Sequence, residues 1–192
     1  MKFGFTTTLA AAALGMTAAH AEPEKYVLDA SHSQVVFTYD HLGFSTTTGM
    51  FSGFEGEIMF DQEAPDNSSV NVSMPVMSMI TGWEKRFEHF MSDDFLGAAE
   101  GDMVTFESTG IEVTGEDTAL ITGDLTLNGV TNSVVLESQL NKAGQHPMAG
   151  KAWAGFDATT TLMRSDYGLG KFAPAVSDEV QVEISIEAMK AQ

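Results

Sequence analysis

Polar and apolar residues alternate with a period of two along most of this chain. The stretch 26–60 shows the pattern twice, on two expected strands joined through residues 43–49. One face of the first strand would carry Val35, Phe37, Tyr39 and His41, and one face of the second would carry Phe54, Gly56, Ile58 and Phe60. Such alternation is typical of strands with one buried face. Because glycine inside a strand permits a bend, Gly53 and Gly56 favour a strongly curved sheet.

The same pattern recurs in shorter segments between turn-forming residues. Further strands are expected at 70–76, 104–113, 120–127, 134–140, 152–162 and 180–188, with a hairpin at Asn128-Gly129. Loops are expected at 61–69, 141–150 and 164–174. The sequence therefore predicts an all-β fold of about eight antiparallel strands, either a sandwich or a barrel. A barrel is favoured because the strands are long and because no edge strand carries the lysine or proline residues that usually keep an exposed edge from pairing with another chain.

One segment, residues 83–96, breaks the alternation. Its charged and aromatic residues suit a short amphipathic helix. Five methionines lie in or near this insert and the final loop, namely Met74, Met77, Met79, Met91 and Met163. Methionine adapts to flexible apolar ligands, although core packing is its usual role. We expect the insert to cover one end of the barrel channel.

The first 21 residues form a separate unit. Lys2 precedes a small and apolar run, and Ala19-His20-Ala21 is a small-x-small cleavage site, so residues 1–21 are predicted to be a secretory signal peptide. The run contains threonines and falls short of the roughly 20 strongly apolar residues that a spanning helix needs. The mature chain, residues 22–192, is expected to be one periplasmic domain.

Charge and cysteine content narrow the function classes. The chain has 27 acidic and 9 basic residues, a net charge of −18, which repels nucleic acid and anionic membrane surfaces. The acids are dispersed, so solubility alone accounts for them. The chain has no cysteine, which excludes disulfides, thiol chemistry and cysteine-ligated metals.

Two polar residues are candidates for contact with a ligand head group. His41 would either bind a head group at the end of the channel or be a wall histidine paired with an acid such as Asp166. Arg164 would either bind a phosphate or form a structural ion pair, because buried arginines are nearly always paired. Both pairs of alternatives stay open.

Residues for metal or hydrolytic chemistry are sparse. His89 has acidic neighbours, but neither His-x-x-x-His nor Glu-x-x-His occurs, so no metal site is predicted. Asp29, His32 and Ser33 are residue types of a catalytic triad. However, no Gly-x-Ser-x-Gly elbow exists, and neighbours within one strand are not expected to converge. No cofactor and no catalytic residue are predicted.

A series of short motifs runs through nearly the whole mature chain in a defined order. The motifs are Tyr26-x-x-Asp29 with His32-Ser33, Phe37-x-x-x-His41-Leu42-Gly43-Phe44-Ser45, Gly49-x-Phe51-x-x-Phe54-x-Gly56-x-Ile58-x-Phe60, Ser78-x-x-Thr81, Arg86-x-x-His89-Phe90-x-Ser92-x-Asp94-Phe95, Phe106-x-Ser108-Thr109, Gly123-x-Leu125-Thr126-Leu127-x-Gly129-Val130-Thr131 and Arg164-Ser165-Asp166-Tyr167-Gly168-Leu169-Gly170. No single motif is specific, but the ordered series resembles the YceI-like family of secreted, lipocalin-like proteins described as polyisoprenoid-binding.

The resemblance implies an extended antiparallel lipocalin-like barrel of about eight strands with a short helical insert. It also implies a hydrophobic channel that binds a polyisoprenoid or quinone-like lipid, without enzyme activity. The residues predicted to bind the ligand are Phe37, Tyr39, His41, Phe54, Ile58, Trp83, Phe90, Phe95, Phe106, Met163 and Arg164. The expected partner is an isoprenoid or other long-chain amphipathic lipid; nucleic-acid binding and stable membrane insertion are not expected.

Two other classes of function stay open. One is an accessory enzyme that acts on a lipid or quinone, and the other is a stress-related structural protein whose barrel is filled by its own side chains. A homodimer also stays open.

Overall fold

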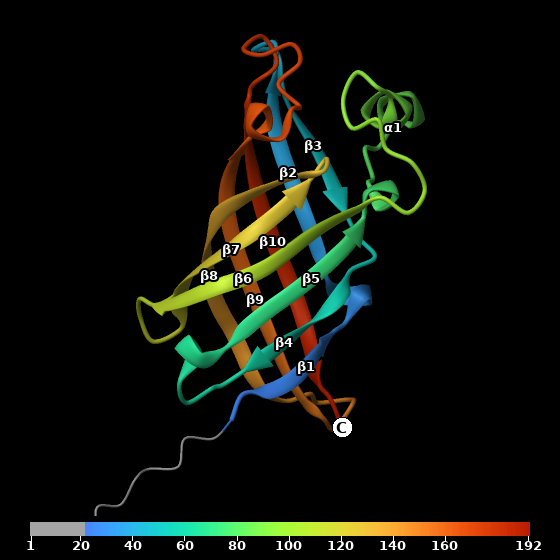
Figure 1. Ribbon diagram of the computed structural model, residues 1–192. Helices are drawn as coiled ribbons and strands as arrows, with labels where there is room; N and C mark the ends of the chain where they lie inside the picture. Colours follow the sequence, from blue (N-terminus) through green and yellow to red (C-terminus); the bar gives the residue numbers. More distant parts are fainter. Residues whose placement is uncertain (1–21) are drawn as a thin grey trace, which may run out of the picture.

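The computed structural model describes residues 22–192, and the predicted signal peptide, residues 1–21, lies outside the described residues. Figure 1 shows long, tilted strands wrapped into a barrel, with one helix beside its upper end. The strands are β1 (Glu24–Leu28), β2 (Gln34–His41), β3 (Ser45–Phe51), β4 (Glu55–Phe60), β5 (Ser69–Pro75), β6 (Met103–Val113), β7 (Thr118–Leu127), β8 (Val130–Gln145), β9 (Ala152–Met163) and β10 (Glu179–Lys190). The helices are α1 (Glu84–Met91) and the short 3₁₀ turns η1 (Ala30–His32), η2 (Pro65–Asn67), η3 (Val76–Ser78) and η4 (Arg164–Tyr167).

The barrel closes because β10 pairs with different strands along its length. Every pairing is antiparallel, and the order β1-β4-β5-β6-β7-β8-β9-β10 returns to β1. One end of β10 pairs with β1 and the other with β2, so β1 and β2 lie along the same edge of β10. Residues 43–49, expected only to connect two strands, instead contain most of strand β3, which pairs with β2, extends the sheet beyond it and is followed by β4. The strands of residues 22–192 thus fill eight positions of a closed barrel, which confirms the predicted fold.

Inward-facing residues follow the period-two pattern, except where a bulge resets it. In β6, Val104 and Phe106 face the barrel interior before the bulge, and Ile111 and Val113 face it afterwards. The register shifts between Ser108 and Gly110, which changes the inward parity from even to odd. The bulge therefore keeps apolar residues inside along all of β6.

The turns agree with the sequence at one predicted site and differ at another. Asn128 and Gly129 have φ of 52° and 71°, as the predicted hairpin between β7 and β8 requires. The loop expected at 141–150 was wrong in its first half, because β8 continues to Gln145 and pairs with the start of β9. Ala143 is the one apolar residue of residues 141–145, so no alternation signals this part of β8, which is set by its backbone pairing with β9.

The buried core lies along β1, β4 and β10, which we call the packed wall. Tyr26 and Phe60 meet edge-on with ring centroids 5.8 Å apart, and Phe60 meets Phe156 edge-on at 5.4 Å. Ile58 and Ala188 are also buried in this cluster. Fully burying one large apolar side chain contributes about 1.5–3 kcal/mol, so the packed wall is a major source of stability.

Helix α1 lies within the insert predicted at residues 83–96 and beside the upper half of β3 (Figure 1). It presents Phe87, Phe90 and Met91 toward the hydrophobic cluster. No helix of residues 22–192 combines the length and the apolar character that crossing a bilayer requires.

Candidate functional site

A cavity of about 1180 Å³ occupies the barrel interior. Its walls are the inward faces of the strands, and most of the lining side chains are apolar. Representative lining residues are Val72 of β5, Phe106 of β6, Leu125 of β7, Leu136 of β8, Phe156 of β9 and Ile184 of β10. The volume exceeds the roughly 300–1,000 Å³ of ordinary small-molecule pockets, so it suits a large apolar ligand.

The predicted inward faces of β2 and of the stretch around β4 do line this cavity. Val35, Phe37, Tyr39 and His41 all contribute to its wall, as do Phe54, Ile58 and Phe60. The strand register inferred from the alternation is therefore confirmed, because the side chains predicted to face inward line the cavity. The structure also brings together, on the same cavity, Trp83, Phe90, Phe95, Phe106 and Arg164.

Two glycines make room for the inward aromatic rings. A Cβ built on Gly49 would lie 2.3 Å from Cζ of Phe37, and one on Gly123 would lie 2.4 Å from Cζ of Phe106. Both distances are far inside van der Waals contact, so the rings occupy the space of the missing side chains. Each glycine lets a phenylalanine lie flat against the wall rather than project further into the cavity.

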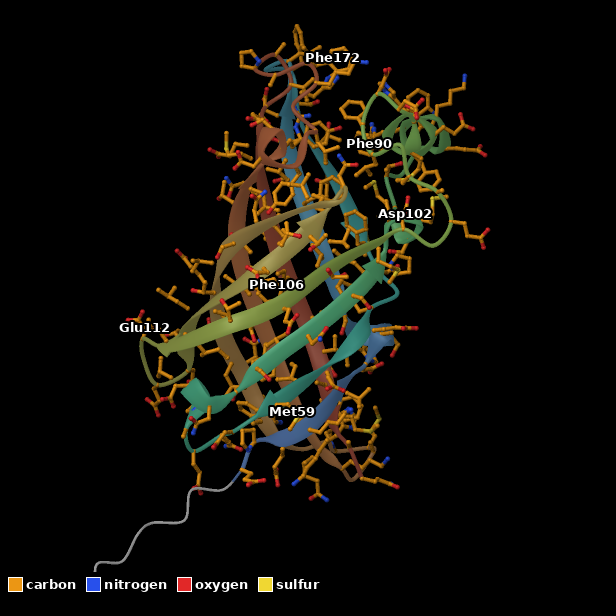
Figure 2. The ribbon with its side chains drawn as sticks, viewed as in Figure 1. Met59, Phe90, Asp102, Phe106, Glu112 and Phe172 are labelled. Atoms are coloured by element: carbon orange, nitrogen blue, oxygen red, sulfur yellow. The ribbon has the colours of Figure 1, made fainter. Side chains whose placement is uncertain are left out.

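Aromatic side chains join three separate elements at the upper end of the cavity, which we call the mouth. Tyr39 of β2 lies 6.2 Å from Phe90 of α1, Phe90 lies 5.5 Å from Phe95, and Phe95 lies 5.9 Å from Phe172 of the β9–β10 loop (ring centroids). Figure 2 shows Phe90 and Phe172 at this end and Phe106 further down the barrel. The insert, residues 83–96, thus packs against the mouth through its aromatic rings, and we call it the lid.

An ion pair also connects the lid to the β9–β10 loop. Lys171 donates to Asp94, and His89 lies 3.4 Å from the same carboxylate. The hydrogen bond and charge of Lys171 hold the pKa of Asp94 below its ordinary value of 3.8. These groups are about half exposed, so solvent screens the attraction and the ion pair adds little to stability.

Arg164 holds the β9–β10 loop in place through backbone carbonyls. Its guanidinium makes four hydrogen bonds, to the carbonyl oxygens of Leu169, Lys171, Val176 and Ser177. Burial lowers its pKa. An ion pair was one of the two roles open for Arg164, but the acceptors of its guanidinium are backbone carbonyls. Most of the N–H groups of Arg164 already donate to these carbonyls. The guanidinium therefore shapes the mouth and has little capacity left for a phosphate.

Three other predicted site residues have distinct positions. His41 lines the cavity and is exposed at the mouth, which agrees with the placement at the channel end rather than inside the wall. Trp83 also lines the cavity but is 60% exposed. Met163 was placed wrongly, because it is 40% exposed and is not a lining residue; its neighbours Leu162 and Arg164 point inward instead. Strand alternation excludes Met163 from the inward face.

The cavity has a second exposed border, the β6–β7 turn, which we call the polar end. Gly115, Glu116, Asp117 and Thr118 line the cavity there and are all exposed. Thr118 accepts a hydrogen bond from the Thr114 hydroxyl at 3.0 Å. This end presents acidic and hydroxyl groups, in contrast to the aromatic mouth.

Two of the three residues that resembled a catalytic triad, Asp29 and His32, meet outside the cavity, contrary to expectation, whereas the hydroxyl of the third, Ser33, donates to the backbone carbonyl of Asp29. Turn η1 interrupts the strand, so Nδ1 of His32 lies 2.7 Å from Oδ2 of Asp29, and Ser31 donates to Oδ1 of Asp29 at 2.6 Å. The hydrogen bond between Asp29 and His32 lowers the pKa of Asp29 and raises the pKa of His32. Ligand atoms of Asp29, His32 and Glu187 lie within 4.8 Å of one another, a spacing that can hold a metal ion. Oε2 of Glu187 accepts a hydrogen bond from Trp153.

Some lining residues are missing from the predicted site. Those on β5 to β10, such as Leu136 and Ile184, could have been found from the alternation that already defined their strands. Leu42 and Phe172 line the mouth from loops, where no periodic signal exists.

Comparisons with known proteins agree with this architecture. A model of the YceI-like domain matches residues 26–188. A UPF0312 protein of Azotobacter vinelandii is 40% identical over 188 residues, which cover 95% of this chain and 97% of that protein. The crystal structure of Burkholderia cenocepacia BcnA matches with a TM-score of 0.75 at 23% identity, over 83% of this chain and 98% of that one. A polyisoprenoid binding domain from Saccharophagus degradans matches with a TM-score of 0.68 at 16% identity, over 86% and 98%.

Proposed function

Because the chain belongs to the YceI-like family, we propose that it is a carrier that sequesters an amphipathic polyisoprenoid or quinone-like lipid in its barrel. The observation that carries this proposal is the apolar cavity of about 1180 Å³, walled by inward side chains of the closed sheet. A structurally similar domain from Saccharophagus degradans is described as polyisoprenoid binding, which agrees in ligand class. The proposed role is binding without catalysis.

Affinity would come from burial of the ligand's apolar chain. Each buried methylene contributes about 0.8 kcal/mol, so a five-carbon isoprene unit contributes about 4 kcal/mol before the costs of binding. We propose that Phe37, Phe54, Ile58 and Phe106 contact this chain. Affinity should therefore rise with chain length and depend little on the head group.

The head group would lie at the mouth, where the lining includes polar side chains. His41 is exposed there beside the aromatic lid residues Trp83, Phe90 and Phe95. A few placed polar groups are enough to orient a ligand whose affinity is apolar. We propose that His41 orients the head group, and that Arg164 acts indirectly by holding the loop.

The place of action would be the periplasm. This part of the proposal depends on the sequence of residues 1–21, with Lys2, an apolar run and a small-x-small site. The mature protein should begin at Glu22 as residue one. N-terminal sequencing of the exported protein would contradict this if it found Met1.

The direct test of the carrier role is a native mass spectrum of protein purified without detergent. A carrier should retain a lipid, and the stripped protein should take up a prenyl lipid with an affinity that grows with the number of isoprene units. An empty spectrum together with no uptake would support the filled-barrel alternative. Conversion of the added lipid by the purified protein would support the accessory enzyme.

A glycine pair sharpens this test. In Gly49→Ala the new Cβ must displace the ring of Phe37, because it would lie 2.3 Å from that ring. The ring would move into the cavity, and prenyl-lipid affinity should fall by about tenfold, the effect of losing one or two methylene-sized contacts. Gly155→Ala is the matched control, since its Cβ would meet only the carbonyl oxygen of Ile186, at 3.8 Å. Equal affinities in both variants would contradict a ligand beside Phe37.

A further inference from the structure

Two loops meet at one extremity of the barrel and expose large apolar side chains there. These are residues 41–45, between β2 and β3, and residues 168–176, between β9 and β10; we call them the tip. The loops are joined by a bridge between His41 and Val176 and by a hydrogen bond of 3.0 Å from Leu42 N to the Ala175 carbonyl. Phe44 is 90% exposed, Leu42 49% and Phe172 50%. Figure 2 shows Phe172 at this extremity, beyond the strands.

Two of these apolar residues are held in a backbone conformation that disfavours them. Leu42 has φ of 60° and Phe172 has φ of 68°, both in the left-handed region. Bulky side chains rarely adopt this region, and such strain tends to persist at sites where function requires a particular residue. Asparagine or glycine would satisfy either turn at lower cost. The tip therefore presents apolar side chains at the expense of stability.

Charge distinguishes the tip from the rest of the surface. The chain carries 27 acidic residues and a net charge of −18, yet neither residues 41–45 nor residues 168–176 contain an acidic residue. Lys171 is the one lysine or arginine in these two segments. An acidic surface is repelled by phospholipid head groups of the same sign, and desolvating its charges is costly. The two segments themselves therefore add no carboxylate, and of the two that adjoin them, Asp40 accepts a hydrogen bond from Gly43 N and Asp94 is paired with Lys171.

The tip is also continuous with the cavity. Leu42 and Phe172 are exposed on one side and line the cavity on the other, while Phe44 is exposed without lining it. Phe172 also packs against Phe95 of the lid. A surface that covered the tip would therefore also meet the mouth. An apolar ligand could then pass from that surface into the cavity with little exposure to water.

We propose that the tip docks reversibly on the surface of a zwitterionic phospholipid bilayer and places the mouth against it. This inference depends on the proposed carrier function, because it supplies the route by which a lipid ligand enters and leaves. Phe44, Leu42 and Phe172 insert at the level of the head groups, where aromatic and aliphatic side chains gain from partial burial. Few side chains take part, so the attachment is weak and transient.

The first experiment measures co-flotation with phosphatidylcholine vesicles. The unmodified mature protein should bind, and Phe44→Ser should lower the partition coefficient by about tenfold, since binding scales with buried apolar area. Met148→Ser is the matched control, because Met148 is 89% exposed in the β8–β9 turn at the other end of the barrel. Equal binding by all three proteins, or no binding by the unmodified protein, would overturn the proposal. Adding phosphatidylglycerol should weaken binding at low salt, because of the net charge of −18.

The second experiment tests which end touches the bilayer. The two native tryptophans, Trp83 and Trp153, are replaced by phenylalanine, and one new tryptophan is introduced by Phe44→Trp or by Met148→Trp. Vesicles of brominated phosphatidylcholine should quench the fluorescence of the first variant and leave that of the second unchanged. Quenching of the second alone, or of both equally, would contradict docking through the tip.

The outcomes separate docking from the carrier function and from self-association. Prenyl-lipid affinity measured without vesicles should be unchanged in Phe44→Ser, because Phe44 does not line the cavity. Ligand binding without vesicle binding would overturn docking and leave the carrier function intact. Vesicle binding without ligand binding would overturn the carrier function and leave docking to the bilayer intact. Light scattering that shows a dimer dissociated by Phe44→Ser would assign the tip to a second copy instead and overturn the proposal.

Discussion

The packed wall and the mouth use the same residue types in opposite ways. In the packed wall, Phe60 is 7% exposed and its ring meets Tyr26 and Phe156 edge-on. At the mouth, Phe172 is half exposed and its backbone is left-handed. Phe60 and Phe172 nevertheless line the same cavity. The first arrangement stabilises the fold, and the second lowers its stability.

This difference indicates how the work of the barrel is divided. Apolar burial along β1, β4 and β10 supplies stability that does not depend on the ligand. The mouth combines exposed apolar residues, left-handed backbone and a solvent-screened ion pair, and each of these features contributes little to stability or reduces it. Mobile and ligand-gating elements are drawn from such regions.

The largest expected effect is in the packed wall. Phe60→Ala removes a buried ring with two edge-on partners, so the free energy of unfolding should fall by about 3–5 kcal/mol. Phe90→Ala at the mouth removes a half-buried ring and two ring contacts, which should lower the free energy of unfolding by about 2 kcal/mol. Urea unfolding of the ligand-free proteins measures both.

Ligand release should show the opposite ranking of these two variants. Phe90→Ala removes aromatic contacts of the lid, so a bound prenyl lipid should dissociate faster from this variant than from the unmodified protein, and the increase should be larger than in Phe60→Ala. If Phe90→Ala instead lost as much stability as Phe60→Ala, the lid would be part of the core, and the division between wall and mouth would fail.

The fold could be predicted largely from the sequence because the wall obeys one simple rule. Inward residues repeat every second position, and the hairpin Asn128-Gly129 has the residues its backbone requires. Three features were beyond that rule, and the first is strand β3, which occupies most of the connection expected at residues 43–49. The extension of β8 to Gln145 depends on backbone pairing with β9, and the bulge between Ser108 and Gly110 changes which positions of β6 face inward partway along the strand.

The site could be predicted only where it belongs to the wall. Phe37 and Ile58 reach the cavity because their strands alternate. Leu42 and Phe172 reach it because distant loops meet at the tip, and no local pattern signals such a contact. Arg164 was recognised as important, but its carbonyl partners lie in the folded loop and leave no trace in residue spacing.

Two turns share one backbone conformation but differ in their residues. Leu42-Gly43 and Asn128-Gly129 both have left-handed backbone at both positions, but only the second has the preferred residues. Leu42→Asn should raise the free energy of unfolding by about 1 kcal/mol, because asparagine tolerates this region. Asn128→Leu should lower it by about 2 kcal/mol, since it adds the same strain and removes the 2.9 Å hydrogen bond to the Tyr167 carbonyl.

Thermal melting of the ligand-free variants checks both signs. For a chain of this size, each 1 kcal/mol corresponds to a change in Tm of about 2–4 °C. A lower Tm in Leu42→Asn would mean that Leu42 stabilises the tip by packing, and the mouth would then resemble the wall. The functional counterpart is that Leu42→Asn should bind phosphatidylcholine vesicles more weakly than the unmodified protein.

The smallest expected effect concerns the ion pair that holds the lid. The pKa of Asp94 in the folded protein lies below 3.8 because Lys171 stabilises its charged form. The folded state therefore binds the proton less readily than the unfolded state, so the contribution of the ion pair is present above pH 3.8 and is lost as the pH falls through the lower, folded pKa. Asp94→Asn should open residues 83–96 slightly faster in hydrogen exchange above that pH, and the difference should shrink in high salt. Asp93→Asn controls for the loss of one acidic group at a neighbouring position. Below the folded pKa of Asp94, residues 83–96 should exchange at the same rate in the unmodified protein and in Asp94→Asn. If the rates still differed there, or if the difference did not depend on salt, Asp94 would hold the lid through hydrogen-bond geometry and not through charge.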